Sequence, residues 1–142
     1  MYKYEIGAFF LRVVLGGIFL IHGVIKFQKG ISETITRFAE YGIPYSELVG
    51  YGVAGIELLG GFFLIIGFST RFIASLMIGI MAGAIYFVKG ELGFLDGFEY
   101  NAALIAMSLY LVISGSTMMS LDKLFAEKEK EKVSKGKIQF RS

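Results

Sequence analysis

Four apolar stretches, each about twenty residues long, decide what this 142-residue chain can fold into. A helix needs about 20 apolar residues to cross the hydrocarbon core of a bilayer. Hydrophobic residues make up 55% of the chain and charged residues only 18%, which is too apolar for a soluble domain of this size. The sequence therefore predicts an all-α integral membrane protein, with four transmembrane helices in an antiparallel up-down four-helix bundle. The four stretches are residues 6–27, 48–68, 72–88 and 100–119.

The charges suggest how the chain is divided and oriented. Residues 1–121 form the predicted four-span membrane domain, and residues 122–142 form a charged tail. Lys and Arg gather in the tail and in the other segments on the side of the two termini, so the positive-inside rule predicts that both termini are cytoplasmic. The first stretch is expected to be a spanning helix and not a cleaved signal peptide, since Arg12 interrupts it and no Ala-x-Ala site follows.

Two connecting segments have patterns of their own. Ile31, Ile35 and Phe38 recur at helical spacing, which predicts a short interfacial helix between the first and second spans, ending near Gly42 and Pro44. Residues 89–98 are expected to form a short polar loop on the outer side. In the tail, residues 127–132 alternate Glu and Lys, which is typical of a solvated helix extension or a disordered tail and does not indicate nucleic-acid binding.

Each span carries a stripe of small and polar residues. Small residues let membrane helices approach closely, so we expect the four stripes to face inward around a polar centre. The stripes are Arg12, Gly16, His22, Gly23 and Lys26; Gly50, Ala54, Glu57 and Gly61; Arg71, Ser75, Gly79, Ala82, Tyr86 and Lys89; and Glu99, Ala103, Ala106, Tyr110, Ser114 and Thr117.

Glu57 is the ionisable residue that most needs an explanation. A carboxylate near mid-membrane costs several kcal/mol unless it is protonated, paired or hydrated. Arg12 is the expected permanent partner, because a guanidinium stays charged and grips a carboxylate through two hydrogen bonds. His22 is expected to be the titrating member. Lys26 and Glu99 are expected at the outer interface, where they pair or reach water by snorkelling.

The polar residues of the four stripes, set among apolar side chains, match what a quinone site needs. Such a site has apolar walls, hydrogen-bond donors for the carbonyl oxygens and a proton source. The predicted catalytic residues are Glu57 and His22. No haem or metal is expected, because His22 is the only histidine and there are no cysteines. A flavin or nicotinamide is expected to be carried by a partner. The predicted quinone-binding residues are Arg12, His22, Lys26, Tyr86, Tyr110 and Glu99.

The order of several short motifs resembles the DoxX family of small four-helix bacterial membrane proteins, which is similar to the DoxD subunit of thiosulfate:quinone oxidoreductases. The resemblance covers about residues 6–124. It implies a multi-pass protein of the bacterial cytoplasmic membrane, in a family often described as oxidoreductases and linked in some members to quinone or catechol handling. The matching residues are Leu11-Arg12, Gly16-Gly17, His22-Gly23, Lys26-Phe27, Gly42-Ile43-Pro44, Glu57 with Gly60-Gly61, Gly67 with Thr70-Arg71, Glu99 and Ser120-Leu121-Asp122.

One departure from the family pattern concerns the last span. The family often has Gly-Pro-Gly before Ser-Leu-Asp, whereas here Ser116 and Thr117 follow Gly115. The last helix is therefore expected to continue further in this chain.

The leading hypothesis is a membrane oxidoreductase component that binds a quinone-like molecule in the bundle centre. The lipid bilayer, a redox subunit or soluble enzyme, and a second copy of the chain are the partners considered. Three alternatives stay open: a small proton-coupled transporter that uses Glu57, a membrane scaffold for a soluble redox enzyme, and an Arg12–Glu57 pair that only locks the helices together.

Overall fold

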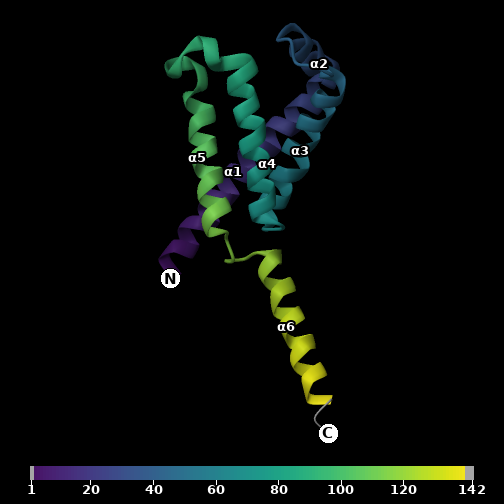
Figure 1. The fold of residues 1–142 in the computed structure, drawn as a ribbon, viewed down its shortest axis with the longest axis vertical. Coiled ribbons are helices and arrows are strands. Elements are labelled where there is room, and N and C mark those ends of the chain that lie inside the picture. Colours follow the sequence, from purple (N-terminus) through teal and green to yellow (C-terminus); the bar gives the residue numbers. More distant parts are fainter. Residues whose placement is uncertain (1, 140–142) are drawn as a thin grey trace.

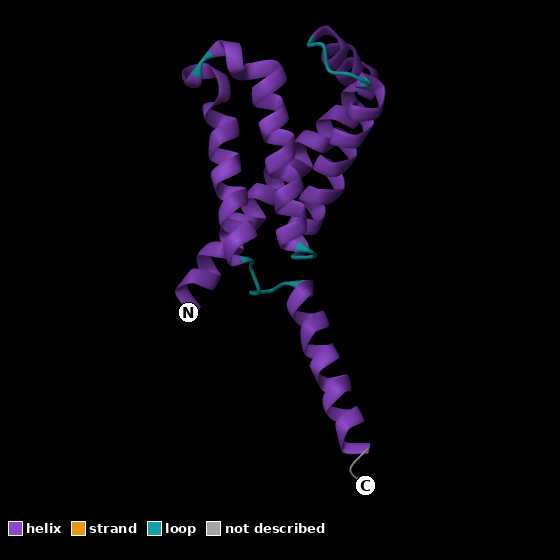
Figure 2. Cartoon of the chain, in the orientation of Figure 1, coloured by secondary structure: helices purple, strands orange, loops and turns teal. Residues whose placement is uncertain are grey.

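The structure, a computed structural model, describes residues 2–139. Throughout this range it contains helices and connecting turns and no strand (Figure 2). Four helical segments are long and apolar enough to cross a membrane, as the hydropathy pattern predicted: Lys3–Lys29, Ser46–Ile66, Thr70–Leu92 and Phe94–Ser114. In chain order the elements are α1 (Tyr2–Lys29), α2 (Ile31–Glu40), α3 (Ser46–Ile66), α4 (Thr70–Ala84), η1 (Ile85–Lys89), η2 (Gly90–Leu92), η3 (Phe94–Phe98), α5 (Glu99–Ser114) and α6 (Leu121–Gln139).

The predicted short helix between the first two spans is confirmed as α2, which has no buried residue. The helix ends at Glu40, just before Gly42, whose φ of +71° reverses the chain. Its apolar face rests on α3, where the side chain of Ile35 lies against Gly50. Residues 89–98, expected as a polar loop, instead contain the end of η1 and the short helical turns η2 and η3.

The helices pack mainly as two pairs, α1 with α3 and α4 with α5 (Figure 1). The first pair is close because glycines lie at its contact. A Cβ atom on Gly61 would come within 2.4 Å of the backbone nitrogen of Leu20, and one on Gly23 within 2.5 Å of that of Leu58. Glycine thus lets the two backbones touch, as expected for membrane helices that associate by packing.

The inward stripes predicted for α1 and α3 are largely confirmed, and those predicted for α4 and α5 are wrong. Ser75, Gly79 and Ala82 are exposed in α4, and Tyr86 is exposed in η1, whereas apolar residues fill the interior. In α5 the inward face consists of Asn101, Leu104, Ser108 and Leu111. The centre of the bundle is therefore an apolar core and not a continuous polar channel. Its buried members are Leu15, Phe19, Leu64, Ile73, Ala74, Met77, Met81, Leu104 and Leu111.

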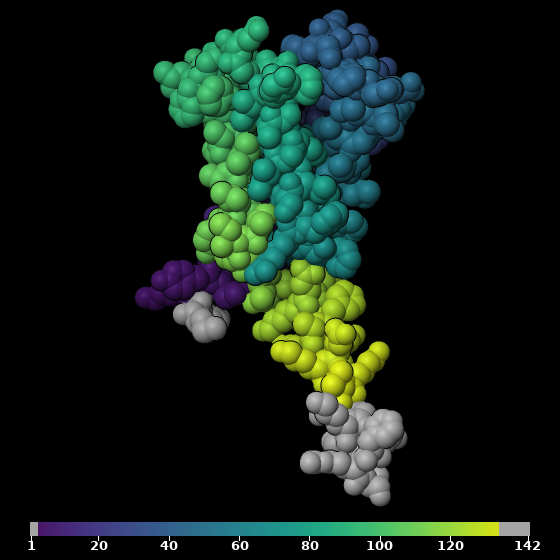
Figure 3. Space-filling view, in the orientation of Figure 1, coloured from purple at the N-terminus to yellow at the C-terminus, as the bar shows by residue number. Residues whose placement is uncertain are grey.

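The expectation that the last span continues past Gly115 is also wrong. Helix α5 ends at Ser114, because Gly115 adopts a φ of +68° that cannot continue a right-handed helix. A short loop leads to α6, which projects away from the four-helix body (Figures 1 and 3). Asp122 at the start of α6 accepts hydrogen bonds from the backbone N–H groups of Ser69 and Thr70, at 2.7 and 3.1 Å. The tail is thus a helix whose base is fixed to the start of α4.

Candidate functional site

An ion pair between Lys26 and Glu57 is the polar feature at the centre of the candidate site. The Lys26 Nζ lies 2.5 Å from Oε2 of Glu57. The Glu57 side chain is only 4% exposed and the Lys26 side chain 24%. A carboxylate this deep needs a cation or a proton, and Lys26 supplies the cation.

Arg12, the partner expected from the sequence, lies elsewhere. It is fully buried and donates hydrogen bonds to the carbonyl oxygens of Ser116 and Met119, at 3.4 and 2.9 Å, and to the hydroxyl of Ser116 at 3.3 Å. The close approach of Arg12 to Gly67 explains why Arg12 does not pair with Glu57. Gly67 is ten residues from Glu57, which is about 15 Å along a helix and beyond the reach of the guanidinium. Arg12 therefore fixes the α5–α6 loop and is not part of the Glu57 site.

A large apolar cavity of about 590 Å³ lies against the ion pair. This volume is within the range of small-molecule sites, which combine mostly apolar walls with a few polar groups that orient the ligand. Here Lys26 and Glu57 are the charged groups of the wall. The other lining residues are Phe38, Ile43, Pro44, Val49, Val53, Ile56, Leu76, Gly79, Ile80, Met81, Gly83, Ala84, Phe87 and Val88.

A smaller cavity of about 170 Å³ lies on another side of Glu57. His22, Tyr100, Asn101 and Lys89 provide its other polar groups, and Ile18, Phe19, Met81 and Leu104 complete the lining. The His22 Nδ1 is 2.8 Å from the carbonyl oxygen of Ile18, to which it donates as an N–H. Glu57 is therefore shared by two cavities, one mostly apolar and one with several polar groups.

Three of the predicted binding residues lie apart from this pair of cavities. Tyr86 is 81% exposed and Tyr110 is 37% exposed, and neither lines the two cavities beside Glu57. Glu99 is exposed and accepts a hydrogen bond from the backbone N–H of Asp96 at 3.4 Å. The structure thus brings His22, Lys26 and Glu57 together and leaves Arg12, Tyr86, Tyr110 and Glu99 outside.

Asn101 is the site residue that the sequence reasoning missed. It is 4% exposed, and its side-chain Nδ2 donates only a weak hydrogen bond to the Met81 sulfur at 3.2 Å. A carboxamide in an apolar span indicates a polar site, because burying an amide without hydrogen-bond partners costs free energy. The sequence contains this signal, but the small residues of the fourth span predict that the opposite face of the helix points inward.

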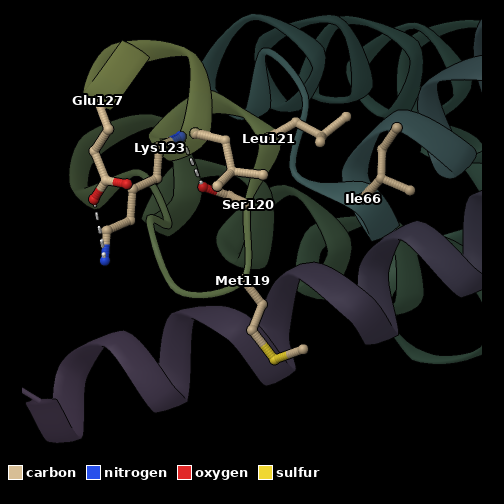
Figure 4. A pocket seen from close by; sticks show the side chains of 7 residues that line it. Ile66, Met119, Ser120, Leu121, Lys123 and Glu127 are labelled. Atoms are coloured by element: carbon tan, nitrogen blue, oxygen red, sulfur yellow. Dashed lines mark hydrogen bonds and ion pairs between the residues drawn. The ribbon is translucent and has the colours of Figure 1, made fainter. Parts of the chain in front are cut away.

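Another cavity, of about 390 Å³, lies at the base of α6 and has a different character (Figure 4). Ile66, Leu121 and Met119 form its apolar walls, and Lys123 and Glu127 pair at 3.9 Å at its exposed edge. Such an exposed pair contributes little, and no buried ionisable side chain lines this cavity. Among residues 2–139, no three His, Asp or Glu side chains gather as a metal site would require.

Comparisons with known proteins agree with the motif pattern. The model of the DoxX family matches residues 7–90, which include His22, Lys26 and Glu57. A Bacillus subtilis protein named "Putative oxidoreductase CatD" is 38% identical over 120 residues, covering 84% of this chain and 87% of the relative. An uncharacterized protein of Haemophilus influenzae is 32% identical over 125 residues, covering 84% of this chain and 90% of the relative. No solved structure matches the chain.

Proposed function

The chain belongs to the DoxX family, and from this membership and the geometry of the Glu57 site we propose that it is a membrane oxidoreductase component that binds a quinone-like molecule. The observation that carries the proposal is the buried Lys26–Glu57 ion pair in the wall of the 590 Å³ apolar cavity. The similarity to a protein named as an oxidoreductase supports the reaction class.

The chemistry of the wall suits a quinone. A quinone ring is apolar on its faces and carries two carbonyl oxygens, so it needs apolar contact and a hydrogen-bond donor. Val53, Ile56 and Phe87 supply apolar contact. Lys26 is the donor, and its positive charge favours the negative charge that develops on a carbonyl oxygen as electrons arrive.

Glu57 is the proton-handling residue in this proposal. Reduction of a quinone to a quinol consumes two electrons and two protons. When Lys26 turns from it to the ligand, the Glu57 carboxylate takes up a proton and passes it to a ligand oxygen, and a second uptake and transfer supplies the other proton. The electrons come from a partner redox protein that carries a flavin or another redox group, and this partner is part of the proposal.

The same ion pair disfavours the proton-coupled transporter. In that mechanism a cationic substrate pairs with the carboxylate when its proton leaves, whereas in the structure the chain's own Lys26 occupies this position, 2.5 Å from Glu57. We place the protein in the bacterial cytoplasmic membrane with both termini cytoplasmic, which the lysines of the tail support.

Titration of quinones into protein reconstituted in lipid nanodiscs tests the proposal. We expect saturable binding that weakens at least about tenfold, or about 1.4 kcal/mol, in Glu57→Gln and in Lys26→Met. Glu47→Gln and Lys29→Met are matched controls, because both residues are exposed and lie outside the large cavity. Absence of saturable binding, or equal affinities in the site variants and the controls, contradicts the proposal.

A further inference from the structure

The smaller cavity beside Glu57 differs from the larger one in the polar groups of its wall. Four residues besides Glu57 bring polar side-chain atoms to a space of about 170 Å³, namely His22, Lys89, Tyr100 and Asn101. A water molecule takes roughly 30 Å³ in the liquid and needs two to four polar partners in a protein interior. The space and the polar groups are therefore sufficient for several water molecules.

Asn101 gives the strongest reason to expect water there. Its Oδ1 atom is buried and accepts no hydrogen bond from the described part of the chain. Buried amide oxygens in folded proteins almost always have a partner, and an unsatisfied one costs about 1–3 kcal/mol. Because Asn101 lines the cavity, a water molecule within it can donate the missing hydrogen bond to this oxygen.

His22 connects the same cavity to the surface of the chain. Its ring is exposed and also lines the 170 Å³ space. The hydrogen bond from Nδ1 to the Ile18 carbonyl leaves Nε2 as the nitrogen that can take up or release a proton. A second polar cleft of about 180 Å³ adjoins His22 on the side of α2, with Lys29 and Arg37 in its wall.

We infer that the small cavity is a hydrated chamber that carries protons between His22 and Glu57, with Asn101 as the residue that positions the water. A proton leaves the His22 imidazolium at Nε2, each water molecule passes one proton to the next, and the last proton reaches a Glu57 carboxylate oxygen. The net change is one proton moved from the histidine to the glutamate, with no other bond formed or broken. This inference rests on the proposed function for the use of that proton.

Two other charged groups lie near the chamber. Lys26 faces Glu57 from α1, and Lys89 lines the chamber from η1. Their ammonium groups donate hydrogen bonds, so Glu57 takes up a proton from the chamber when Lys26 turns from its carboxylate to the ligand. The Tyr100 ring lies 6.4 Å from the His22 ring and closes the chamber on the α5 side.

The sequence permits an unusually direct test, because His22 is its only histidine and Asn101 its only asparagine. Protein labelled with ¹⁵N at these two residue types gives, in solid-state NMR, one side-chain amide signal from Asn101 and two ring signals from His22. In lipid bilayers, we expect magnetisation to pass from water to the Asn101 side-chain amide at mixing times of a few milliseconds. Leu104→Phe narrows the chamber and should slow this transfer, whereas Leu109→Phe on the exposed face of α5 should not.

The ¹⁵N chemical shifts of the His22 ring test the connection to Glu57. Glu57→Gln replaces an acceptor oxygen at the other end of the water chain with an N–H donor, so the His22 shifts should change, while Glu47→Gln should leave them unchanged. The inference is wrong if wild-type Asn101 receives no magnetisation from water, or if the His22 shifts are the same in both variants. Neither measurement uses a quinone. Failure of quinone binding would thus contradict only the proposed function. Absence of magnetisation transfer from water to Asn101 would contradict only the hydrated chamber.

Discussion

Lys26 and Glu57 are 31 positions apart in the sequence, and their charged groups lie 2.5 Å apart in the structure. The register of α1 on α3 produces this pairing. Gly23 sits against the backbone of Leu58, so Lys26, one helical turn further along α1, can turn its side chain back to Glu57. A pair made by two tightly packed helices is held in place by the fold itself.

Replacing only one of Lys26 and Glu57 should destabilise the protein more than replacing both. Glu57→Gln leaves an unpaired ammonium group and Lys26→Met leaves an unpaired carboxylate, whereas the double variant leaves neither. The expected coupling in a double-mutant cycle is about 1–3 kcal/mol, with the partial exposure of Lys26 favouring the lower part of that range. The free energy of unfolding in mixed micelles measures it. Additive single effects would show that the two charges do not interact.

The close packing of α1 on α3 predicts a contrast between two glycines of α3. Gly61→Ala places a methyl group against the backbone of Leu20 and should cost about 1–3 kcal/mol of unfolding free energy. Gly55→Ala is the matched control, because a Cβ atom there meets nothing within 4 Å. The control should be neutral or stabilising, since alanine is the better helix former. Similar losses in both variants would contradict the observed register.

Arg12 is predicted to matter for stability and not for ligand affinity. Arg12→Met removes the donors that hold Ser116 and Met119 and should lower the unfolding free energy by about 3 kcal/mol. Arg71→Met is the control, because Arg71 is exposed and makes one long hydrogen bond, 3.4 Å from the carbonyl oxygen of Ile113. Quinone affinity should stay within about threefold of wild type in both variants, a difference of less than 1 kcal/mol. A tenfold loss of quinone affinity in Arg12→Met would show that Arg12 is part of the Glu57 site.

The proposed orientation can be tested with single cysteines, because the chain contains none of its own. Glu91 in η2 and Glu129 in α6 are exposed. The connection between α4 and α5, which contains η2, and helix α6 lie at opposite ends of the molecule (Figure 1). In intact cells, a membrane-impermeant maleimide should label Glu91→Cys directly and Glu129→Cys only after the membrane is opened. The reverse pattern would place the tail outside the cell.

Much of the fold could be predicted because its signals are local. The existence of the four spans and the end of α2 near Gly42 follow from hydropathy, periodicity and capping along short windows of sequence, which left the tail open between a helix and a disordered segment. The inward faces of α4 and α5 could not be predicted in this way. Small residues such as Gly79 and Ala103 fit a helix contact and a lipid-facing surface equally well, and packing against neighbours decides between them.

The site was only partly predictable for a related reason. The cost of burying Glu57 indicated that a cation must be near, but the choice between Arg12 and Lys26 depends on how far α1 slides along α3. That offset is a tertiary quantity set by contacts such as Gly23 against Leu58. Asn101 was detectable as a polar group in an apolar span, whereas its place beside Glu57 required the packed structure.

Photoaffinity labelling with an azidoquinone, followed by mapping of the labelled peptides, is the decisive test of quinone binding beside Glu57. We expect adducts on residues of the 590 Å³ cavity in α3 and α4, such as Val53, Ile56 and Ala84, which disappear when excess unmodified quinone competes. Labelling in Glu57→Gln should be much weaker than in Glu47→Gln. Adducts spread over lipid-facing residues such as Phe10 and Ile113, with no competition by quinone, would contradict it.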